Sequence, residues 1–337
     1  MKKREIYELF LVGVLMLGVS ASVCAGVKAE LETEKGFKKY LFISMSPDGL
    51  VYRPPNVPVG VTATLPLNQI ISVHFGVKYD YKAVFMAERE RRWTTAARLI
   101  LESVMPTLPF MALPENDAVA PSFEAAQYLE RAANYYMRRG DLKSVAKARK
   151  LYGQALKIFS AVAGADWHYL AEPAALKVVC CQVGAGKLDD ASAGLREARI
   201  PEPYDGAYGQ YWLAKARLLL AQGDARAACS AVAKTVIFDN KNVSLFPDAL
   251  MLFAHCHEEI MEWHRARDIY YEVLRLFPRT EWGDTAFERL KYIMENGFTA
   301  EKESANIAKV FFGIDEDMNA LANELIEKRE KMGEKLK

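Results

Sequence analysis

Residues 250–278 read LMLFAHCHEEIMEWHRARDIYYEVLRLFP, and this stretch decides the fold of most of the chain. Apolar or small residues recur every three or four positions in its first half and again in its second half, which is helical spacing. The small side chains of Ala254 and Ala266 allow two helices to lie close together, and Tyr270 fills the space against a third. Pro278 ends the second helix because proline cannot donate the backbone hydrogen bond. The stretch therefore predicts a packed pair of antiparallel helices.

The same arrangement recurs along the chain. At three further places a glycine-containing break separates two runs with helical spacing. The breaks are Gly140-Asp141, Gly186-Lys187 and Gly223-Asp224. Glycine suits such a position because it readily takes the left-handed conformation that ends a helix and starts a reversal. We therefore predict several consecutive helix pairs.

Together these copies resemble the tetratricopeptide repeat, a helix–turn–helix unit of about 34 residues. The resemblance covers roughly residues 80–313. It implies a mainly α fold: a tetratricopeptide-like α-solenoid of antiparallel helix pairs, with a small N-terminal β element before it. An irregular helical bundle without any repeat relationship is the alternative.

These patterns divide the chain into successive segments, each with its own expectation. They are a signal peptide at 1–25, a linker at 26–37, a small β-hairpin or β-sheet element at 38–76, a first helical pair at 78–104, a proline-rich loop at 105–121, tetratricopeptide-like repeats at 122–313 and a C-terminal capping helix at 314–337. In the β element, the turn tripeptide at 47–49 separates two runs rich in β-branched and aromatic residues, which predicts a hairpin. An exposed strand there could also pair with a strand of a partner.

The first residues have the layout of a secretory signal peptide. A basic start at Lys2 to Arg4 precedes a short apolar run and then small residues, with cleavage expected after Ala25 and Ala29 as the second choice. The apolar run is shorter than the roughly 20 residues that span a bilayer. The pattern predicts an exported protein of the periplasm or the outer-membrane surface. Attachment to the membrane is expected only if Cys24 is lipidated or the leader is retained.

The charge balance argues against a nucleic-acid partner. The chain has 44 basic and 43 acidic residues and a net charge of +1. Nucleic-acid affinity comes from the neutralisation of phosphates, which needs a basic excess. The sequence also lacks a glycine-rich phosphate loop after a strand and the Gly-x-Ser-x-Gly motif. We therefore expect no enzyme activity and no cofactor.

One cluster, HCHEE at residues 255–259, allows a metal-binding alternative. His255 and Glu259 are four residues apart on one helical face, and Glu262 could join them from the next turn. The metalloprotease motif fails because Met261 stands where the second histidine would be. No metal is our expectation. His257 is interpreted as a side chain that fills the space between helices.

Four cysteines follow the leader, at positions 180, 181, 229 and 256. Their spacing matches no zinc motif, so small buried thiols are the simplest interpretation. A disulfide between Cys229 and either Cys181 or Cys256 stays open, because sequence alone does not give pairing.

The family resemblance also implies a site, because its ligands usually lie along a concave groove lined by the first helix of each pair. The positions that would face this groove are Gln127, Glu130, Asn134, Arg138, Lys177, Arg217, His255 and Glu259. Cys180 would lie beside them on the same side. The family members that clamp a C-terminal carboxylate need a fuller basic and asparagine set, so no clamp is expected.

The segment around 266–286 further resembles repeats of exported envelope proteins, among them the outer-membrane assembly lipoprotein and the Tol–Pal-associated coordinator. The resemblance implies a non-catalytic protein–protein interaction scaffold or adaptor of the bacterial cell envelope, which binds a segment of another protein in its groove. A component like the assembly lipoprotein is the alternative function.

Overall fold

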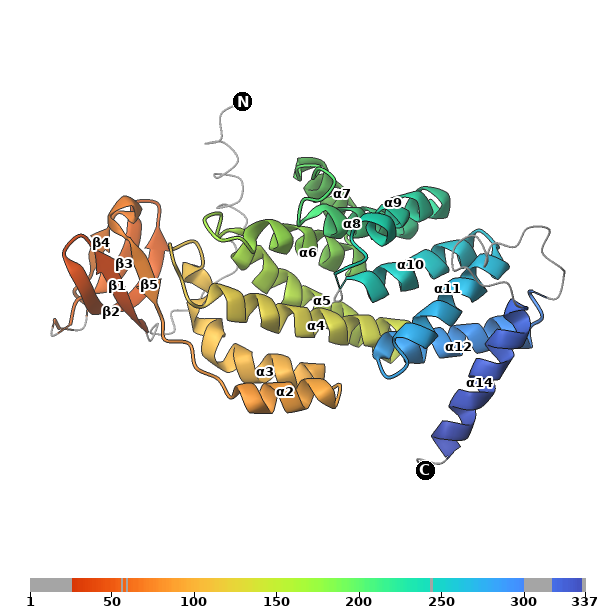
Figure 1. Cartoon of the computed structure of the whole chain (residues 1–337). Helices are drawn as coiled ribbons and strands as arrows, with labels where there is room; N and C mark the ends of the chain where they lie inside the picture. Colours follow the sequence, from red (N-terminus) through yellow and green to blue (C-terminus); the bar gives the residue numbers. More distant parts are fainter. Residues whose placement is uncertain (1–25, 56, 59, 243–244, 300–316, 335–337) are drawn as a thin grey trace. The chain divides into compact units, whose positions relative to one another are not determined.

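The computed structural model describes residues 26–55, 57–58, 60–242, 245–299 and 317–334 (Figure 1). The expected signal peptide, its cleavage site and Cys24 lie outside these residues. Within the described part, the chain is mainly helical, with twelve α-helices and a small antiparallel sheet. It divides into a β unit, Met1–Val77 with Leu113–Ala118, and a helical unit, Lys78–Ala112 with Val119–Lys337.

The β unit contains a five-stranded antiparallel sheet in the order β4-β3-β2-β1-β5. Its strands are β1 (Val27–Thr33), β2 (Gly36–Ser46), β3 (Gly49–Arg53), β4 (Ala63–Leu65) and β5 (Ser72–His74). The predicted hairpin is confirmed, since β2 and β3 pair from Ser46 and Gly49 onward. Leu31, Phe42 and Leu50 are almost fully buried and form the apolar side of the sheet.

Two expectations for this part of the chain are wrong. Residues 26–37 are not a linker, because β1 pairs with β2 along its full length, from Val27 opposite Phe42 to Thr33 opposite Gly36. The charged residues of β1 alternate with buried Ala29 and Leu31, so a half-buried strand was mistaken for a polar connection.

Residues 105–121 are also more ordered than the expected loop. Met105–Phe110 form a 3-10 helix, and α4 already begins at Val119. Proline is tolerated in the first turn of a helix, because its missing N–H has no helical partner there, so Pro121 does not interrupt α4. The stretch Leu113–Ala118 belongs to the β unit, where Asp117 accepts hydrogen bonds from the backbone of Phe75 (2.7 Å) and Gly76 (2.9 Å).

The helical unit consists of helices joined mostly by short turns. They are α2 (Tyr81–Arg89), α3 (Trp93–Val104), α4 (Val119–Arg139), α5 (Leu142–Ala163), α6 (Ala171–Gly184), α7 (Leu188–Glu197), α8 (Tyr208–Ala221), α9 (Ala225–Phe238), α10 (Phe246–Glu259), α11 (Trp263–Leu276), α12 (Glu281–Glu295) and α14 (Met318–Glu334). Among the described helices, the extensive contacts join neighbours that are one or two places apart in chain order. None of these helices combines the length and the apolar character needed to cross a membrane.

Five of the helix–helix turns share one backbone motif. The last residue before the next helix cap has a positive φ: 72° at Gly140, 82° at Gly186, 87° at Gly223, 61° at Met261 and 56° at Arg91. In the last of the glycine turns, the N–H of Asp224 donates to the carbonyl of Leu219 (3.0 Å), and the turns at Arg91, Gly186 and Met261 make the equivalent bond. This bond satisfies a carbonyl that the ending helix leaves free. The sequence pattern located the three glycine turns but not the two formed by Met261 and Arg91.

The stretch that decided the fold forms α10 and α11, and their seam is sealed by apolar side chains. Ala254, Ala266 and Tyr270 are at most 1% exposed and belong to one cluster with α12. We call this cluster the Tyr270 seam. Helix α14 adds Ala322 and Ile326 to it, which places an amphipathic helix at the C-terminal end of the seam.

Candidate functional site

Two adjoining cavities lie along the helices that come first in each pair. The smaller has a volume of about 220 Å³ and is lined mainly by α4, with α6, α10 and α12. The larger has a volume of about 840 Å³ and is lined mainly by residues of α4, α6, α8, α10 and α12, with Tyr152 of α5 and Tyr270 of α11. Asn134, Arg138 and Asp248 line both, so the two cavities form one continuous depression, which we call the inner groove.

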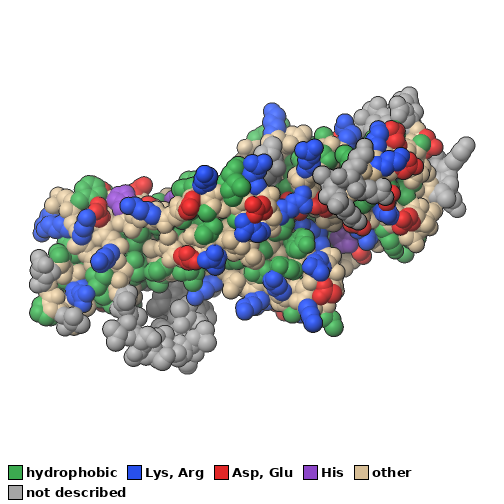
Figure 2. All heavy atoms as spheres, turned by 90° about the horizontal axis from the view of Figure 1, so that it is seen from below, with side chains coloured by type: hydrophobic (Ala, Val, Ile, Leu, Met, Phe, Trp, Pro, Cys, Tyr) green, Lys and Arg blue, Asp and Glu red, His purple; other side chains and the backbone are tan. Residues whose placement is uncertain are grey.

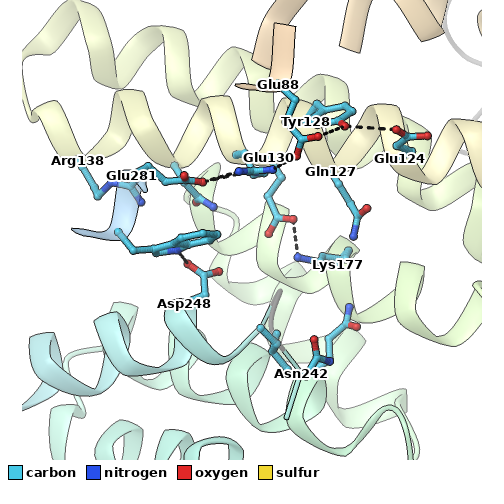
Figure 3. A pocket seen from close by; sticks show the side chains of 15 residues that line it. Glu88, Glu124, Gln127, Tyr128, Glu130, Arg138, Lys177, Asn242, Asp248 and Glu281 are labelled. Carbon is cyan, nitrogen blue, oxygen red and sulfur yellow. Dashed lines mark hydrogen bonds and ion pairs between the residues drawn. The ribbon is translucent and has the colours of Figure 1, made fainter. Parts of the chain in front are cut away.

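The structure brings all eight residues of the predicted site to this groove. Gln127, Glu130 and Lys177 line the smaller cavity. Arg217, His255 and Glu259 line the larger one, together with Cys180. Asn134 and Arg138 lie where the two cavities meet (Figure 3 shows the smaller cavity). These side chains come from four helices, which share only their position as first members of a pair.

Sequence reasoning missed several groove residues with strong polar character. They are Glu88, Arg131, Asp248, Glu281, Trp282 and Arg289. Asp248 could have been found, because it stands seven residues before His255 and therefore on the same helical face. Glu88 could not, since it comes from α2, a helix whose sequence gives no sign that it reaches α12.

A network of buried ions crosses the floor of the groove. The Glu130 carboxylate, whose side chain is only 3% exposed, accepts from Lys177 Nζ (2.7 Å) and from Arg217 (3.2 Å). Arg217 also pairs with Asp248 at 2.5 Å, and the indole N–H of Trp282 donates to the same carboxylate at 3.2 Å. Four helices are thus linked by two cations and two anions. Such a network is stable only while every member keeps its partners.

The pKa values in the network show that mutual attraction outweighs burial. Burial alone would raise the pKa of the Asp248 carboxyl. The nearby cations Arg217 and Lys177 lower it by more, so the pKa lies below its ordinary value. Burial lowers the pKa of Lys177, yet the adjacent Glu130 brings it above the usual range. These groups therefore stay charged at neutral pH.

Arg131 closes the groove at one end. Its guanidinium pairs with Glu88 of α2 at 2.9 Å and with Glu281 of α12 at 2.9 Å, and lies near the rings of Trp93 and Trp282, 5.8 Å and 5.7 Å from their centroids. We call this arrangement the Arg131 clasp. From α4, it connects α2 with α12.

A second contact supports the clasp. Arg91, in the turn between α2 and α3, pairs with Asp284 of α12 and donates to the carbonyl of Arg279 at 2.7 Å. Arg329 of α14 pairs with the same Asp284. Both ends of the described helical unit therefore meet at α12.

Arg138 differs from the other cations of the groove. Within the part of the chain that the structure describes, its guanidinium makes no hydrogen bond and no ion pair. The side chain is open to solvent through the groove, yet the surrounding walls lower its pKa, and nearby Asp248 and Glu281 offset only part of this effect. Arg138 therefore presents an unpaired positive charge at the junction of the two cavities.

The HCHEE cluster is arranged for ion pairing. His255 contacts Glu258 through Nδ1 (3.3 Å) and Glu259 through Nε2 (3.8 Å), and Arg289 binds Glu258 through two nitrogens at 3.0 Å and 2.7 Å. Glu262 does not join this set. Its carboxylate accepts a hydrogen bond from Nδ1 of His257 instead, at 2.8 Å. Among the described residues, no three His, Cys, Asp or Glu side chains form a group that could hold a metal ion.

The four cysteines that follow the expected leader have free thiols, and three of them are buried. Cys229 Sγ lies 3.5 Å from Nε2 of His257, whose ring also packs edge-on against Phe253. Burial raises the pKa of the Cys229 thiol to about 11 and lowers the pKa of His257. The thiol is therefore protonated at neutral pH and the imidazole is uncharged, which is the opposite of an activated nucleophile.

Taken together, the groove offers paired ions that fix its walls, one unpaired guanidinium, the amide side chains of Gln127 and Asn134, and an apolar stretch in the larger cavity. On the face drawn in Figure 2, acidic and basic side chains are interspersed and do not gather into a patch of one sign. A comparison of the chain with models of known protein families finds no match, and a comparison with curated protein sequences finds none either.

Proposed function

We propose that this protein is a non-catalytic adaptor of the tetratricopeptide type, which binds a segment of another protein in the inner groove. One observation carries the proposal. Residues chosen only for their equivalent positions in successive helix pairs come together along one continuous depression. That convergence is what a stack of similar units produces and an irregular bundle does not.

The packing of the helices supports a solenoid of helix pairs. Among the described helices, the extensive contacts join neighbours one or two places apart in chain order, and one turn motif recurs with the same backbone geometry. Each pair then shields the apolar side of the next, and the first helices form the inner surface.

A polypeptide is the ligand that fits the groove best. The larger cavity, at about 840 Å³, has room for several side chains. Met137, Met251 and Leu252 give it apolar contact surface beside its charged groups. Mixed lining of this kind is typical of protein interfaces, where apolar contacts supply affinity and polar contacts set the register.

We place this activity in the envelope of a bacterium, on the strength of the basic start and apolar run expected to direct export. Attachment to the membrane would then depend on Cys24 or on a retained leader. Fractionation of cells that express the full chain checks this part separately: recovery of an unprocessed protein in the cytoplasm would contradict it and would leave the groove proposal intact.

The groove proposal is tested by crosslinking at single sites. A photoreactive amino acid is placed at Gln127 or His255, which line the two cavities, and in a matched variant at Lys157, which is exposed on α5. In native cells we expect the two groove positions to capture the same defined protein and Lys157 to capture none of it. Equal capture at all three positions, or none at the groove positions, would contradict the proposal.

A further inference from the structure

Arg138 is an exception among the cations of the inner groove. Arg131, Lys177, Arg217 and Arg289 also line it, and each is ion-paired with at least one carboxylate. Arg138 alone, of the five lining cations in the described residues, has no such partner. An arginine carries five N–H donors in a fixed plane, and those of Arg138 face the solvent of the groove. The groove therefore holds donor capacity that a ligand can use.

A second donor lies beside it on the same face of α4. Asn134 stands one helical turn before Arg138, and its side-chain carbonyl accepts the hydroxyl hydrogen of Tyr152 at 2.5 Å. This bond orients the amide so that its NH₂ group is left for another acceptor. Both side chains line both cavities, so their donors converge on one place.

We infer that Arg138 and Asn134 together receive the carboxylate of an aspartate or glutamate side chain within the bound segment. This inference rests on the proposed function and adds the chemistry of the ligand. A planar carboxylate matches the donor plane of a guanidinium and accepts two parallel bonds from it. A single negative charge also suits the site, because Asp248 and Glu281 act on Arg138 from nearby and would repel a doubly charged phosphate.

The position of Arg138 in the groove favours a carboxylate from an internal acidic side chain of the ligand over the carboxylate at a C-terminus. The groove extends from this residue in two directions, into the smaller and into the larger cavity. A segment bound there can continue on both sides of its acidic residue, which an internal residue allows and a C-terminal carboxylate does not. The apolar lining of the larger cavity, with Met251 and Leu252, then receives an apolar side chain next to the acid. The expected ligand is an extended segment with an acidic residue beside an apolar one.

The test uses a displayed library of random 12-residue peptides fused at both ends, so that no free terminus is present. The library is selected on the wild-type protein, on Arg138→Gln and on Arg139→Gln. Arg139 is the matched control, because it is the neighbouring arginine at the end of α4 and its side chain is 56% exposed beside Asp141. Thermal unfolding of both variants verifies that they are folded.

We expect wild-type protein and Arg139→Gln to select peptides with an acidic residue adjacent to Leu, Met or Phe. These peptides should bind Arg138→Gln about 10- to 100-fold more weakly, as expected for the loss of a charge-assisted hydrogen bond. The reversed variant Arg138→Glu should select peptides with a basic residue at the same place.

Other outcomes separate the inference from the proposed function. Selected peptides that lack an acidic residue, or that bind Arg138→Gln as well as wild type, overturn the inference and leave an adaptor groove. A second library carries peptides with free C-termini. If binders come only from this second library, the inference that the acidic residue is internal is overturned. If neither library yields binders, or if a bulky His255→Trp substitution in the groove leaves all binding intact, the proposed function fails as well.

Discussion

The Tyr270 seam and the inner groove are built from the same helices, but they are held together by different forces. Helices α10 and α12 place Ala254, Ala286 and Leu290 in the seam, each fully buried. The opposite side of the same helices places Asp248 and Glu281 in the groove, paired with arginines from other helices. Close apolar packing excludes water from the seam. The groove keeps its charges partly hydrated, and they compensate one another.

This difference teaches where stability and recognition reside. Burial of apolar area is the main favourable term in folding, so the seam supplies most of the stability of the helices that it joins. Ion pairs that must be desolvated gain little net energy, but a broken one is costly. The network in the groove therefore fixes the positions of side chains more than it adds to stability, and this division gives the following expectations.

The largest loss of stability is expected in the seam. Tyr270→Ala removes a ring that is 1% exposed and leaves a cavity among α10, α11 and α12. The free energy of unfolding should fall by about 3–5 kcal/mol, the range for large-to-small changes in a core. Urea denaturation measures it, with Tyr169→Ala at an exposed position as the control. A loss below about 1 kcal/mol would show that the seam is not the main support.

The next largest effect is expected in the floor of the groove. Glu130→Gln leaves Lys177 and Arg217, each with a side chain 16% exposed, without the anion they share. The free energy of unfolding should fall by about 3 kcal/mol, because Lys177 loses its carboxylate partner while largely buried and Arg217 keeps only Asp248. Glu259→Gln is the matched control, an acidic residue of the same groove with a side chain 53% exposed, and it should change stability by less than about 0.5 kcal/mol. Equal effects of the two variants would contradict the buried network.

The response to acid should come from the groove and not from the seam. The pKa of Asp248 is lower in the folded protein than its ordinary value, so the unfolded chain binds protons first as the pH falls. The stabilisation is complete above the ordinary pKa of about 4 and is lost as the pH falls through the depressed value. Asp248→Asn should flatten this acid limb in unfolding curves recorded from pH 5 to pH 2. Leu290→Ala, a seam residue that lines neither cavity, should lower the whole curve without changing the slope of that limb.

Turn residues should give smaller effects of opposite sign. Met261 is left-handed and its side chain is 76% exposed, so Met261→Gly should stabilise the protein by about 1 kcal/mol through relief of backbone strain. Gly223 has the same backbone conformation, and an added Cβ would meet no atom within 4 Å. Gly223→Ala should therefore destabilise by about 1 kcal/mol through the backbone alone. Thermal unfolding of both variants checks the pair, and changes of the same sign would refute the shared motif.

The smallest effect on stability is expected for Arg138→Gln. Because the guanidinium has no ion pair among the described residues, its removal breaks no bond within the protein. The free energy of unfolding should stay within about 0.5 kcal/mol of wild type. A loss as large as that of Glu130→Gln would mean that Arg138 belongs to the network and is not reserved for a ligand.

Much of the helical unit could be predicted from sequence, because each helix pair is specified by local spacing. Ala254, Ala266 and Tyr270 lie within 16 residues of one another along the chain and pack between neighbouring helices. The groove positions followed from the resemblance to the repeat family, applied to the first helix of each pair, which is why Gln127 and Glu259 were assigned to one groove without any knowledge of contacts. The turn at Met261 was not predicted, since no local signal forces methionine into a left-handed conformation.

The rest depends on contacts between distant residues. Arg131 and Glu281 are 150 residues apart in sequence. Whether they meet depends on the packing angles of all the helices between them. Small angular differences accumulate over such a distance, so helical spacing alone does not give it. In the β unit, β1 was missed for a related reason. One face of this strand is exposed to solvent, so its sequence contains many charged residues and resembles a polar loop. Its pairing with β2 and β5 is known only once the sheet is formed.

The Arg131 clasp has a consequence for how the protein can change in size. An open stack tolerates the insertion or loss of a repeat, because only the neighbours of the new unit are affected. Here an extra pair anywhere between α4 and α12 would move Glu281 by about the 8–10 Å that separates packed helices, beyond the reach of Arg131. The number of helices between α4 and α12 is therefore constrained by the ion pair between Arg131 and Glu281, and an inserted or deleted helix pair would break that contact.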